Sequence, residues 1–364
     1  MNVVVVGAGV IGYAVAYELA ARGAQVRIVD SRGQGQGATR ASAGILAPYI
    51  EGHSSALLQL GIASLNQYEG FLTRLAADAR LDVEYRRTGT LQVALDDDEA
   101  RTLETQATRL AGAGVAHSLV SATGISLLEP GIASGARAGL IVPQHGYVGV
   151  SSLMTALVGA GTRRGVTPVT AKVEAVVTAG GRVTLTASDG DLVCDAVVVA
   201  AGSWSGGITT GGAPPVPVRP VRGQLVQLQA SPGTLQRVVW GSACYLVPWM
   251  NGTVLVGATV EDVGFDERVT DEGVRRLRAD GERIVPALGS AAFVEARAGL
   301  RPATNDELPI VGPSSTMRGV FYATGHYRNG VLLAPWTASA VADLVLTGTS
   351  TSELDSVRPD RFGL

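Results

Sequence analysis

Three glycines near the start of the chain have the spacing of a nucleotide-binding turn. Gly7, Gly9 and Gly12 form a G-x-G-x-x-G pattern directly after the β-branched run Val3–Val6, where an apolar helical pattern over 12–22 begins. In such a turn the first glycine permits a sharp bend, the second lets the backbone touch a pyrophosphate, and the third lets helix and strand pack closely. The start of the helix offers unpaired N–H groups and a positive dipole end to the phosphates.

An acidic residue follows the glycines at the sequence spacing that is typical of a ribose-binding carboxylate. A second strand is predicted over Gln25–Val29, and Asp30 stands at its end, 18 positions after Gly12. In dinucleotide-binding turns a carboxylate about 20 residues beyond the glycines binds the ribose. Strand, helix and acid together predict a dinucleotide site. The alternative is a glycine-rich turn that binds nothing.

The rest of the chain favours FAD over NAD as the dinucleotide. An NAD domain would usually continue with a plain second βαβ half. This chain instead enters a loop rich in Gly, Ser and Arg at 33–45, and further segments of the same kind of domain return at 196–205 and 321–335. A cofactor domain assembled from separated pieces suits a large, buried and permanently bound cofactor.

The chain resembles FAD-dependent amine and amino-acid oxidases of the D-amino-acid oxidase type, and most of all their glycine oxidase branch, which is linked to bacterial thiamine synthesis. Six motifs spread along the chain carry the resemblance: VVVVGAGVIG (3–12), TRASAGI (39–45), PVRGQL (220–225), CYLVP (244–248), GLRPAT (299–304) and GHYRNGVLLAP (325–335). The family implies an α/β fold with a discontinuous, Rossmann-like FAD-binding domain made of 1–84, 140–216 and 299–364. It also implies a second, α+β substrate domain with a mostly antiparallel sheet, made of 85–139 and 217–298.

The resemblance also implies which residues contact FAD, which we expect to be bound non-covalently. Arg40 and Ser42 can donate hydrogen bonds to phosphate or ring oxygens, and Gly44 lets the backbone approach a flat ring. The complete set of expected cofactor contacts is Gly7, Gly9, Val10, Ile11, Gly12, Asp30, Ser31, Arg40, Ala41, Ser42, Gly44, Ile45, Val173, Ala201, Gly202, Trp204, Arg301, Arg328, Asn329, Gly330, Val331 and Leu332.

The last motif contains a glycine-rich turn before a helix. The N–H groups of Gly330, Val331 and Leu332 are expected to point at the pyrimidine edge of the flavin, which becomes negative on reduction. Aligned donors and a helix N-terminus would stabilise that charge where it develops.

Three side chains are expected to act on the substrate: Arg301, Tyr245 and Arg328. By resemblance, Arg301 and Tyr245 hold a carboxylate, which a guanidinium matches with two parallel hydrogen bonds, and Arg328 lies near the flavin. Val260 falls where glycine oxidases tend to carry a larger methionine, so the pocket has room for more than glycine. His326 is interpreted as structural.

The implied activity is a FAD-dependent oxidase. A small amino acid or secondary amine, such as glycine, sarcosine or a small D-amino acid, would lose hydride to flavin N5, and dioxygen would be reduced to hydrogen peroxide. The alternatives are a dehydrogenase of the same fold that uses a quinone or another acceptor, a two-domain NAD-dependent dehydrogenase, and a nucleotide-binding regulatory protein.

Composition excludes other classes. The 364 residues are 46% apolar and 17% charged, with a net charge of −3, so no basic surplus exists to attract nucleic acid or a membrane. Cys194 and Cys244 are too few for a disulfide framework, and neither a signal peptide nor a stretch long enough to cross a membrane is recognised, so we expect a cytoplasmic protein. Relatives often associate, so a homo-oligomer is open. The histidines are not spaced as metal ligands, so no metal is expected; they are His53, His117, His145 and His326.

Hydrophobic periodicity predicts the elements that position these residues. Helices are expected over 55–80, 96–113, 152–164 and about 270–286, and a last one over 335–347 with Pro335 in its first turn. Further strands are expected over 83–95, 195–201 and 319–324, in a hairpin made of 169–177 and 182–187, and repeatedly between 221 and 300.

Overall fold

The valine run near the N-terminus forms an inner strand, β1 (Asn2–Val6), of a parallel sheet in the computed structural model, which describes residues 1–51 and 54–364. Val3 and Val5 belong to the core on one face of the sheet, whereas Val4 and Val6 belong to a second core on the other face. Both faces are therefore buried, as an uninterrupted apolar run in a parallel sheet predicts.

This sheet has six strands in the order β20-β21-β13-β1-β2-β9, and all neighbours are parallel except β20 and β21. The predicted strand–turn–helix–strand unit at the N-terminus is present, with helix α1 between β1 and β2. The bounds are β2 (Gln25–Val29), β9 (Thr167–Val169), β13 (Ala196–Val199), β20 (Ile310–Pro313), β21 (Val320–Thr324) and α1 (Val10–Ala21).

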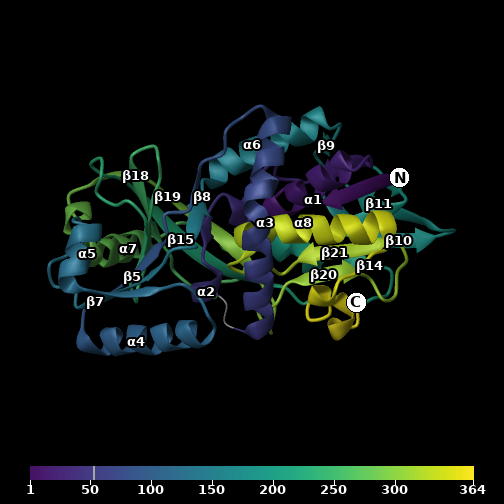
Figure 1. The fold of residues 1–364 in the computed structure, drawn as a ribbon. Helices are drawn as coiled ribbons and strands as arrows, with labels where there is room; N and C mark the ends of the chain where they lie inside the picture. The colour runs from purple at the N-terminus through teal and green to yellow at the C-terminus, as the bar shows by residue number, and fades with distance from the viewer. Residues whose placement is uncertain (52–53) are drawn as a thin grey trace.

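Helices cover one face of the six-stranded sheet and a smaller sheet covers the other (Figure 1). The helices are α1, α3 (Ser55–Ala79), α6 (Val150–Arg163) and α8 (Gly330–Thr347). The smaller sheet has the order β12-β11-β10-β14. Its strands are β10 (Val173–Ala179), β11 (Arg182–Ala187), β12 (Leu192–Cys194) and β14 (Thr209–Thr210).

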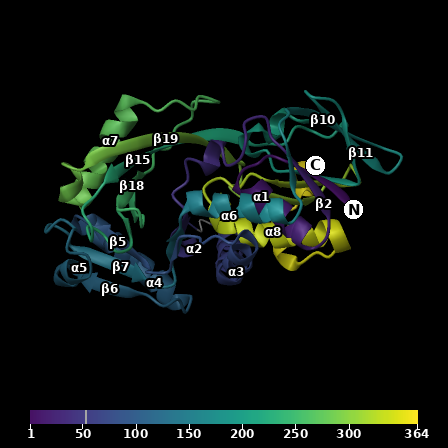
Figure 2. The ribbon, with the colours of Figure 1, turned by 90° about the horizontal axis from the view of Figure 1, so that it is seen from above.

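An eight-stranded, mostly antiparallel sheet forms the other end of the molecule (Figure 2), in the order β19-β15-β18-β17-β16-β5-β7-β6. Its strands are β5 (Thr90–Ala94), β6 (Ser118–Ser121), β7 (Ala138–Val142), β15 (Arg219–Gln229), β16 (Val238–Trp240), β17 (Tyr245–Pro248), β18 (Thr253–Gly257) and β19 (Ala292–Ala303). Helices α4 (Asp97–Gly112), α5 (Ala122–Leu128) and α7 (Asp271–Ile284) flank it.

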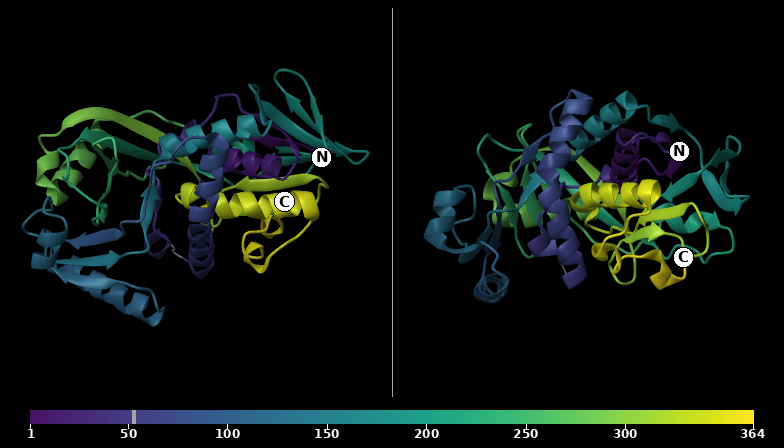
Figure 3. Two further views of the ribbon diagram at one scale, coloured as in Figure 1. Left: turned by 45° about the horizontal axis from the view of Figure 1, so that its top comes forward. Right: turned by 45° about the vertical axis from the view of Figure 1, so that its right-hand side comes forward.

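A small sheet, one short helix and two long strands connect the two large sheets. A three-stranded sheet and one short helix lie between them: β3 (Ile45–Leu46), β4 (Tyr85–Arg86), β8 (Gly146–Val148) and α2 (Pro48–Glu51). Strands β15 and β19 pair along 11 register positions and extend from the eight-stranded sheet toward the helices (Figures 2 and 3). The fold is therefore α/β with a second, mostly antiparallel sheet, as predicted.

The predicted domain boundaries stay a prediction. Strand β7 runs through the boundary at 139/140, and β19 runs through the one at 298/299. Both strands belong to the eight-stranded sheet, which therefore continues past these two points.

Two of the predicted strands are wrong as single elements, because each divides between two sheets. The segment 83–95 contains β4, in the three-stranded sheet, and β5, in the eight-stranded sheet, and Gly89 lies between them. The segment 169–177 contains the end of β9 and the start of β10. Alternation of apolar residues shows that a segment is extended, but it does not show which sheet accepts its hydrogen bonds.

Helix α8 begins at Gly330, so the predicted start near Pro335 is wrong. A proline inside a helix leaves the carbonyl four residues earlier without its donor. That carbonyl is Val331 O, and the buried hydroxyl of Tyr68 on α3 donates to it at 2.6 Å. Ser64 Oγ, one turn earlier on α3, accepts from the N–H of Trp336 at 3.2 Å. Helix α3 therefore supplies what the proline removes.

From the sequence no stretch is expected to be long enough to cross a membrane, and helix α8 does not meet that expectation. By length and composition alone it is long and apolar enough to do so. However, 67% of it is buried inside the protein, where its residues join the core made by α1, α3 and the sheet. It is a core helix of this fold.

Replacing Tyr68 with Phe is expected to lower the free energy of unfolding by about 1–3 kcal/mol, because Val331 O would then be buried without a partner. The measurement is urea-induced unfolding. Tyr85→Phe is the matched control, since its ring stacks on Tyr68 at 6.0 Å while its hydroxyl accepts only an exposed hydrogen bond from Arg87. Equal losses in the two variants would contradict the role of the Tyr68 hydroxyl.

Candidate active site

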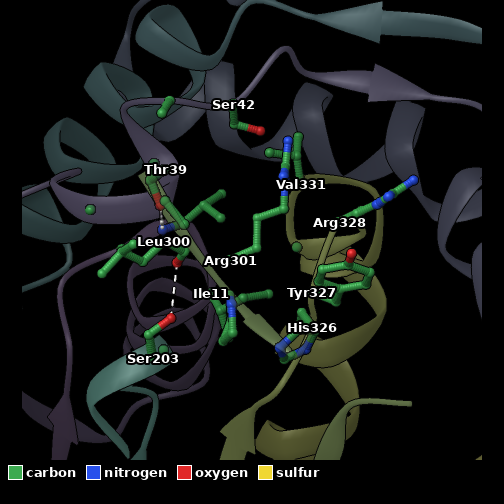
Figure 4. Close-up of a pocket in the computed structure, with 18 of the residues that line it drawn as sticks. Ile11, Thr39, Ser42, Ser203, Leu300, Arg301, His326, Tyr327, Arg328 and Val331 are labelled. Carbon is green, nitrogen blue, oxygen red and sulfur yellow. Dashed lines mark hydrogen bonds between the residues drawn. The ribbon is translucent and has the colours of Figure 1, made fainter. Parts of the chain in front are cut away.

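A single cavity of about 890 Å³ is lined by both large sheets and by the loops that follow their strands. It extends from the first glycine turn to the last one, and Figure 4 shows side chains from both regions around it. Its charged lining is mainly basic. The basic side chains are Arg32, Lys172, Arg276, Arg301 and Arg328, and the acidic ones are Asp30 and Asp280. A cavity of this sign attracts phosphates and carboxylates.

The first glycine turn separates into a binding part and a packing part. Gly7 and Gly9 line the cavity, together with Val10 and Ile11. Gly12 does not line it: a Cβ there would lie 1.8 Å from Gly7 O, so Gly12 is needed for close packing alone. The turn thus lays the start of α1 against the cavity, as the sequence pattern predicts.

Asp30 has two roles in the structure. One of its carboxylate oxygens accepts from the N–H of Ala8 at 2.8 Å, and the other accepts from the N–H of Arg32 at 2.7 Å. The same residue lines the cavity beside Ser31. Asp30 therefore holds the first glycine turn in place and keeps lone pairs for a ribose hydroxyl.

Loop 37–45 forms one wall. Ala41, Ser42, Gly44 and Ile45 line the cavity, as expected. Gly44 has φ 75°, and a Cβ would lie 1.9 Å from Val148 O, so its backbone approaches strand β8 closely.

Arg40 does not line the described cavity. It is exposed, and its carbonyl accepts a long hydrogen bond of 3.4 Å from Arg297. The residue beside it, Thr39, lines the cavity instead. Its Oγ1 accepts a hydrogen bond of 3.0 Å from the N–H of Val10, at the start of α1. The sequence argument placed Thr39 in this motif but did not assign it a contact; a hydroxyl beside a helix start was the available signal.

Another wall of the cavity comes from β10 and from the 3₁₀ turn Gly202–Gly207. Val173, Ala201, Gly202 and Trp204 all line the cavity, as expected. The Trp204 ring lies under the guanidinium of Arg32 at 4.4 Å. Ser203 Oγ donates to the carbonyl of Leu300 at 2.9 Å and so ties this turn to β19 (Figure 4).

The last glycine turn places the start of α8 at the cavity. Asn329, Gly330 and Val331 line it, whereas Leu332 is turned into the core. Because the helix begins at Gly330, the N–H groups of 330–332 are its first three and have no acceptor within the helix. Asn329, the N-cap residue, makes no side-chain hydrogen bond to them.

Tyr327, within this turn, has an unusual backbone conformation. Its φ is 47°, a conformation that is rare for a bulky residue, and strained residues of this kind cluster at functional sites. Its N–H donates to Pro302 O at 2.9 Å, and the guanidinium of Arg328 lies 5.1 Å from its ring. The turn is thus tied to the segment that follows Arg301.

His326 lines the cavity but is a neutral, structural residue. Its Nε2 lies 3.0 Å from the hydroxyl of Thr337 on α8. Complete burial lowers its pKa from 6.5 to about 3. The ring is therefore uncharged at ordinary pH.

Arg301 and Tyr245 enter the cavity from the eight-stranded sheet. Arg301 is on β19 and Tyr245 begins β17, and both line the cavity. Two glycines make room for them: a Cβ at Gly257 would lie 2.5 Å from the Tyr245 ring, and a Cβ at Gly223 would lie 2.2 Å from the Arg301 guanidinium. Sequence reasoning missed these glycines, because their constraint comes from neighbouring strands.

The donor set fits FAD. One end of the cavity has the carboxylate of Asp30, which is placed as a ribose would require, the middle has the start of α1, and the far end has the start of α8. At Gly9 a Cβ would meet only Thr39 Oγ1, at 3.1 Å, so the backbone there is open to a pyrophosphate. In contrast, over residues 1–51 and 54–364 no three His, Cys, Asp or Glu side chains gather as metal ligands. His53 lies outside these residues.

Replacing Asp30 with Ala is expected to weaken FAD binding by at least about tenfold, because a charge-assisted hydrogen bond to the ribose and the anchor of the first glycine turn are both lost. The dissociation constant is measured by quenching of flavin fluorescence. Asp195→Ala is the control, since Asp195 also accepts a backbone N–H, from Asn2 at 2.7 Å, but lies outside the cavity lining. An unchanged FAD affinity in Asp30→Ala would contradict the assignment.

Comparison with known proteins agrees with this geometry. Residues 2–344 match the DAO family, described as FAD dependent oxidoreductase. Glycine oxidase from Geobacillus kaustophilus is 34% identical over 349 residues, which cover 94% of this chain and 92% of that protein. Glycine oxidase from Pseudomonas putida is 32% identical over 365 residues, covering 95% and 94%. The crystal structure of the Geobacillus enzyme superposes with a TM-score of 0.93 at 32% identity, over 98% of this chain and 97% of that one. This chain therefore belongs to the DAO family of FAD-dependent oxidoreductases.

Proposed function

We propose that the protein oxidises the Cα–N bond of a small amino acid or secondary amine, such as glycine, sarcosine or a small D-amino acid. The observation that carries the proposal is that Arg301 and Tyr245 enter the same cavity whose walls fit FAD. The relatives named glycine oxidase support this substrate class. When bound, FAD takes up the two electrons of the oxidation, and it passes them to dioxygen, which is reduced to hydrogen peroxide.

Arg301 and Tyr245 bind and orient the substrate. The guanidinium pairs with the substrate carboxylate through two parallel hydrogen bonds, and the Tyr245 hydroxyl adds a third. Three hydrogen bonds to the carboxylate restrict the substrate α-carbon to one position relative to the cofactor. Orientation of this kind is a main source of rate acceleration when two reactants must meet.

Among the described residues that line the cavity, His326 is the one histidine, and it is neutral and bonded to Thr337. The substrate amine must be neutral when the Cα–H bond breaks, and its proton passes to solvent. Oxidation therefore needs no side-chain base, and the imine product is hydrolysed by water.

The pocket beside Tyr245 is bordered by the Trp240 ring, whose centroid lies 5.2 Å from that of the Tyr245 ring, and by several small side chains. Ser242, Ala243 and Cys244 precede Tyr245, and Val260 lines the cavity with 55% of its surface exposed. These side chains leave space beyond a glycine-sized ligand. We therefore include N-substituted glycines and small D-amino acids in the substrate range. Both cysteines of the chain are free and buried, which supports a reducing compartment such as the cytoplasm.

Replacing Arg301 with Ala is expected to raise KM for the amine about 10–100-fold, because one charge-assisted contact is worth ~1.5–3 kcal/mol. FAD affinity should change far less. Activity is followed as hydrogen peroxide released by the FAD-loaded enzyme over a panel of small amines. Arg297→Ala is the control, since Arg297 is on the same strand but outside the cavity lining. An unchanged KM would reject the role of Arg301.

The pH profile should report the substrate and not His326. Because burial holds the pKa of His326 at about 3, this histidine is neutral throughout pH 5–9 and gives no limb there. Below the pKa of the substrate amine, kcat/KM should rise about tenfold per pH unit as the amine loses its proton. The limb should move when a substrate of lower amine pKa is used. A limb that stays fixed, and that disappears in His326→Asn, would contradict this assignment.

A further inference from the structure

Arg301 is held in the cavity by the segment that follows β18. Its Nη1 donates to the carbonyl of Thr259 at 2.9 Å, and more weakly to the carbonyl of Arg222 at 3.4 Å. The guanidinium lies directly over Gly223, which leaves no side chain beneath it. Since one of the five N–H groups of the guanidinium is committed to Thr259, the direction of the others depends on where Thr259 lies.

Thr259 is itself fixed by the carboxylate of Glu261. The buried Thr259 hydroxyl donates to Oε1 of Glu261 and accepts from the N–H of Gln224 at 2.9 Å. Oε1 also accepts from the Gln224 amide at 2.7 Å, and Oε2 accepts from both Nε and Nη2 of Arg222. One carboxylate therefore joins the side chains of Thr259, Gln224 and Arg222.

The network is charged and mostly buried, and the Glu261 side chain at its edge is 24% exposed. The Arg222 side chain is 6% exposed and also pairs with Asp266 at 3.1 Å. Burial by itself would raise the pKa of Glu261, but hydrogen bonds from Thr259, Gln224 and Arg222 outweigh it and lower the pKa. The backbones of Arg222 and Glu261 also exchange two hydrogen bonds, at 2.9 and 3.0 Å. Glu261 is thus an anionic anchor with a fixed place.

We propose that Glu261 is a positioning residue for substrate carboxylate recognition. By holding Thr259, it keeps the Thr259 carbonyl beside Nη1 of Arg301 and leaves the rest of the guanidinium directed at the cavity. Glu261 does not line the cavity and acts through Thr259 and Arg301. This proposal rests on the proposed function, in which Arg301 binds the carboxylate.

The test is the affinity of the FAD-loaded enzyme for acetate, followed by the change in flavin absorbance. Glu261→Gln keeps the shape of the side chain and removes its charge; it should weaken acetate binding about tenfold and raise KM for glycine similarly, with kcat and FAD affinity within twofold. Asp262→Asn is the matched control, because this neighbouring carboxylate is 81% exposed, and it should behave as the wild type. Acetate affinity unchanged in Glu261→Gln, or reduced equally in Asp262→Asn, would overturn the proposal.

A double-mutant cycle separates positioning from general damage. In an Arg301→Ala background, Glu261→Gln should weaken acetate binding no further; an equal loss with and without Arg301 would overturn the proposal. If Arg301→Ala alone leaves acetate affinity unchanged, the proposed function is wrong at Arg301 and this proposal fails with it. Thr259→Val is the second variant, because it removes the hydroxyl bonded to Glu261 without altering the charge, and it should reproduce the loss of acetate affinity.

Discussion

The N–H groups in the first turn of a buried helix need acceptors, and the two helices that begin at the cavity, α1 and α8, do not obtain them from their N-cap side chains. Of the other helices, α3, α4, α5 and α7 each begin at a serine, aspartate or threonine that accepts a backbone N–H, whereas α6, whose N-cap residue is Gly149, has no side-chain cap. At α1 one N–H is met by Thr39, from a distant loop. An anionic cofactor bound across the cavity would meet the same need at both helices. The glycine turns, the mainly basic lining and the pairing of the two helices therefore suit one and the same ligand.

A second constraint brings substrate and cofactor together. Strand β19 begins in the eight-stranded sheet and ends beside the cofactor walls, where the Leu300 carbonyl accepts from Ser203. A Cβ at Gly299 would lie 2.8 Å from Ala41, so strand and loop 37–45 are in close contact. Arg301 follows directly on the same strand. The eight-stranded sheet therefore fixes the position of the Arg301 guanidinium. The residues around the guanidinium belong to the part of the cavity that fits FAD.

The local parts of this arrangement are visible in the sequence because each rests on residues close together in the chain. The G-x-G-x-x-G turn, the valine strand and Asp30 lie within 30 residues, and their roles follow from backbone geometry alone. Helix bounds over 55–79, 97–112 and 271–284 differ little from those predicted by periodicity. Helix α8 was the exception, because its early start depends on Tyr68 supplying a hydrogen bond that the local pattern around Pro335 does not contain.

By itself the sequence determined the α/β class, the glycine turn and the family, and with the family it predicted a set of site residues. Only the tertiary structure decided that Arg40 faces away while Thr39 caps α1, that Gly44 is required by strand β8, and that Glu261 stands behind Arg301. These facts depend on which atoms of distant segments come within about 3 Å of one another. Spacing along the chain records helix and strand periods, but it carries no measure of the distance between segments that meet only in the folded core.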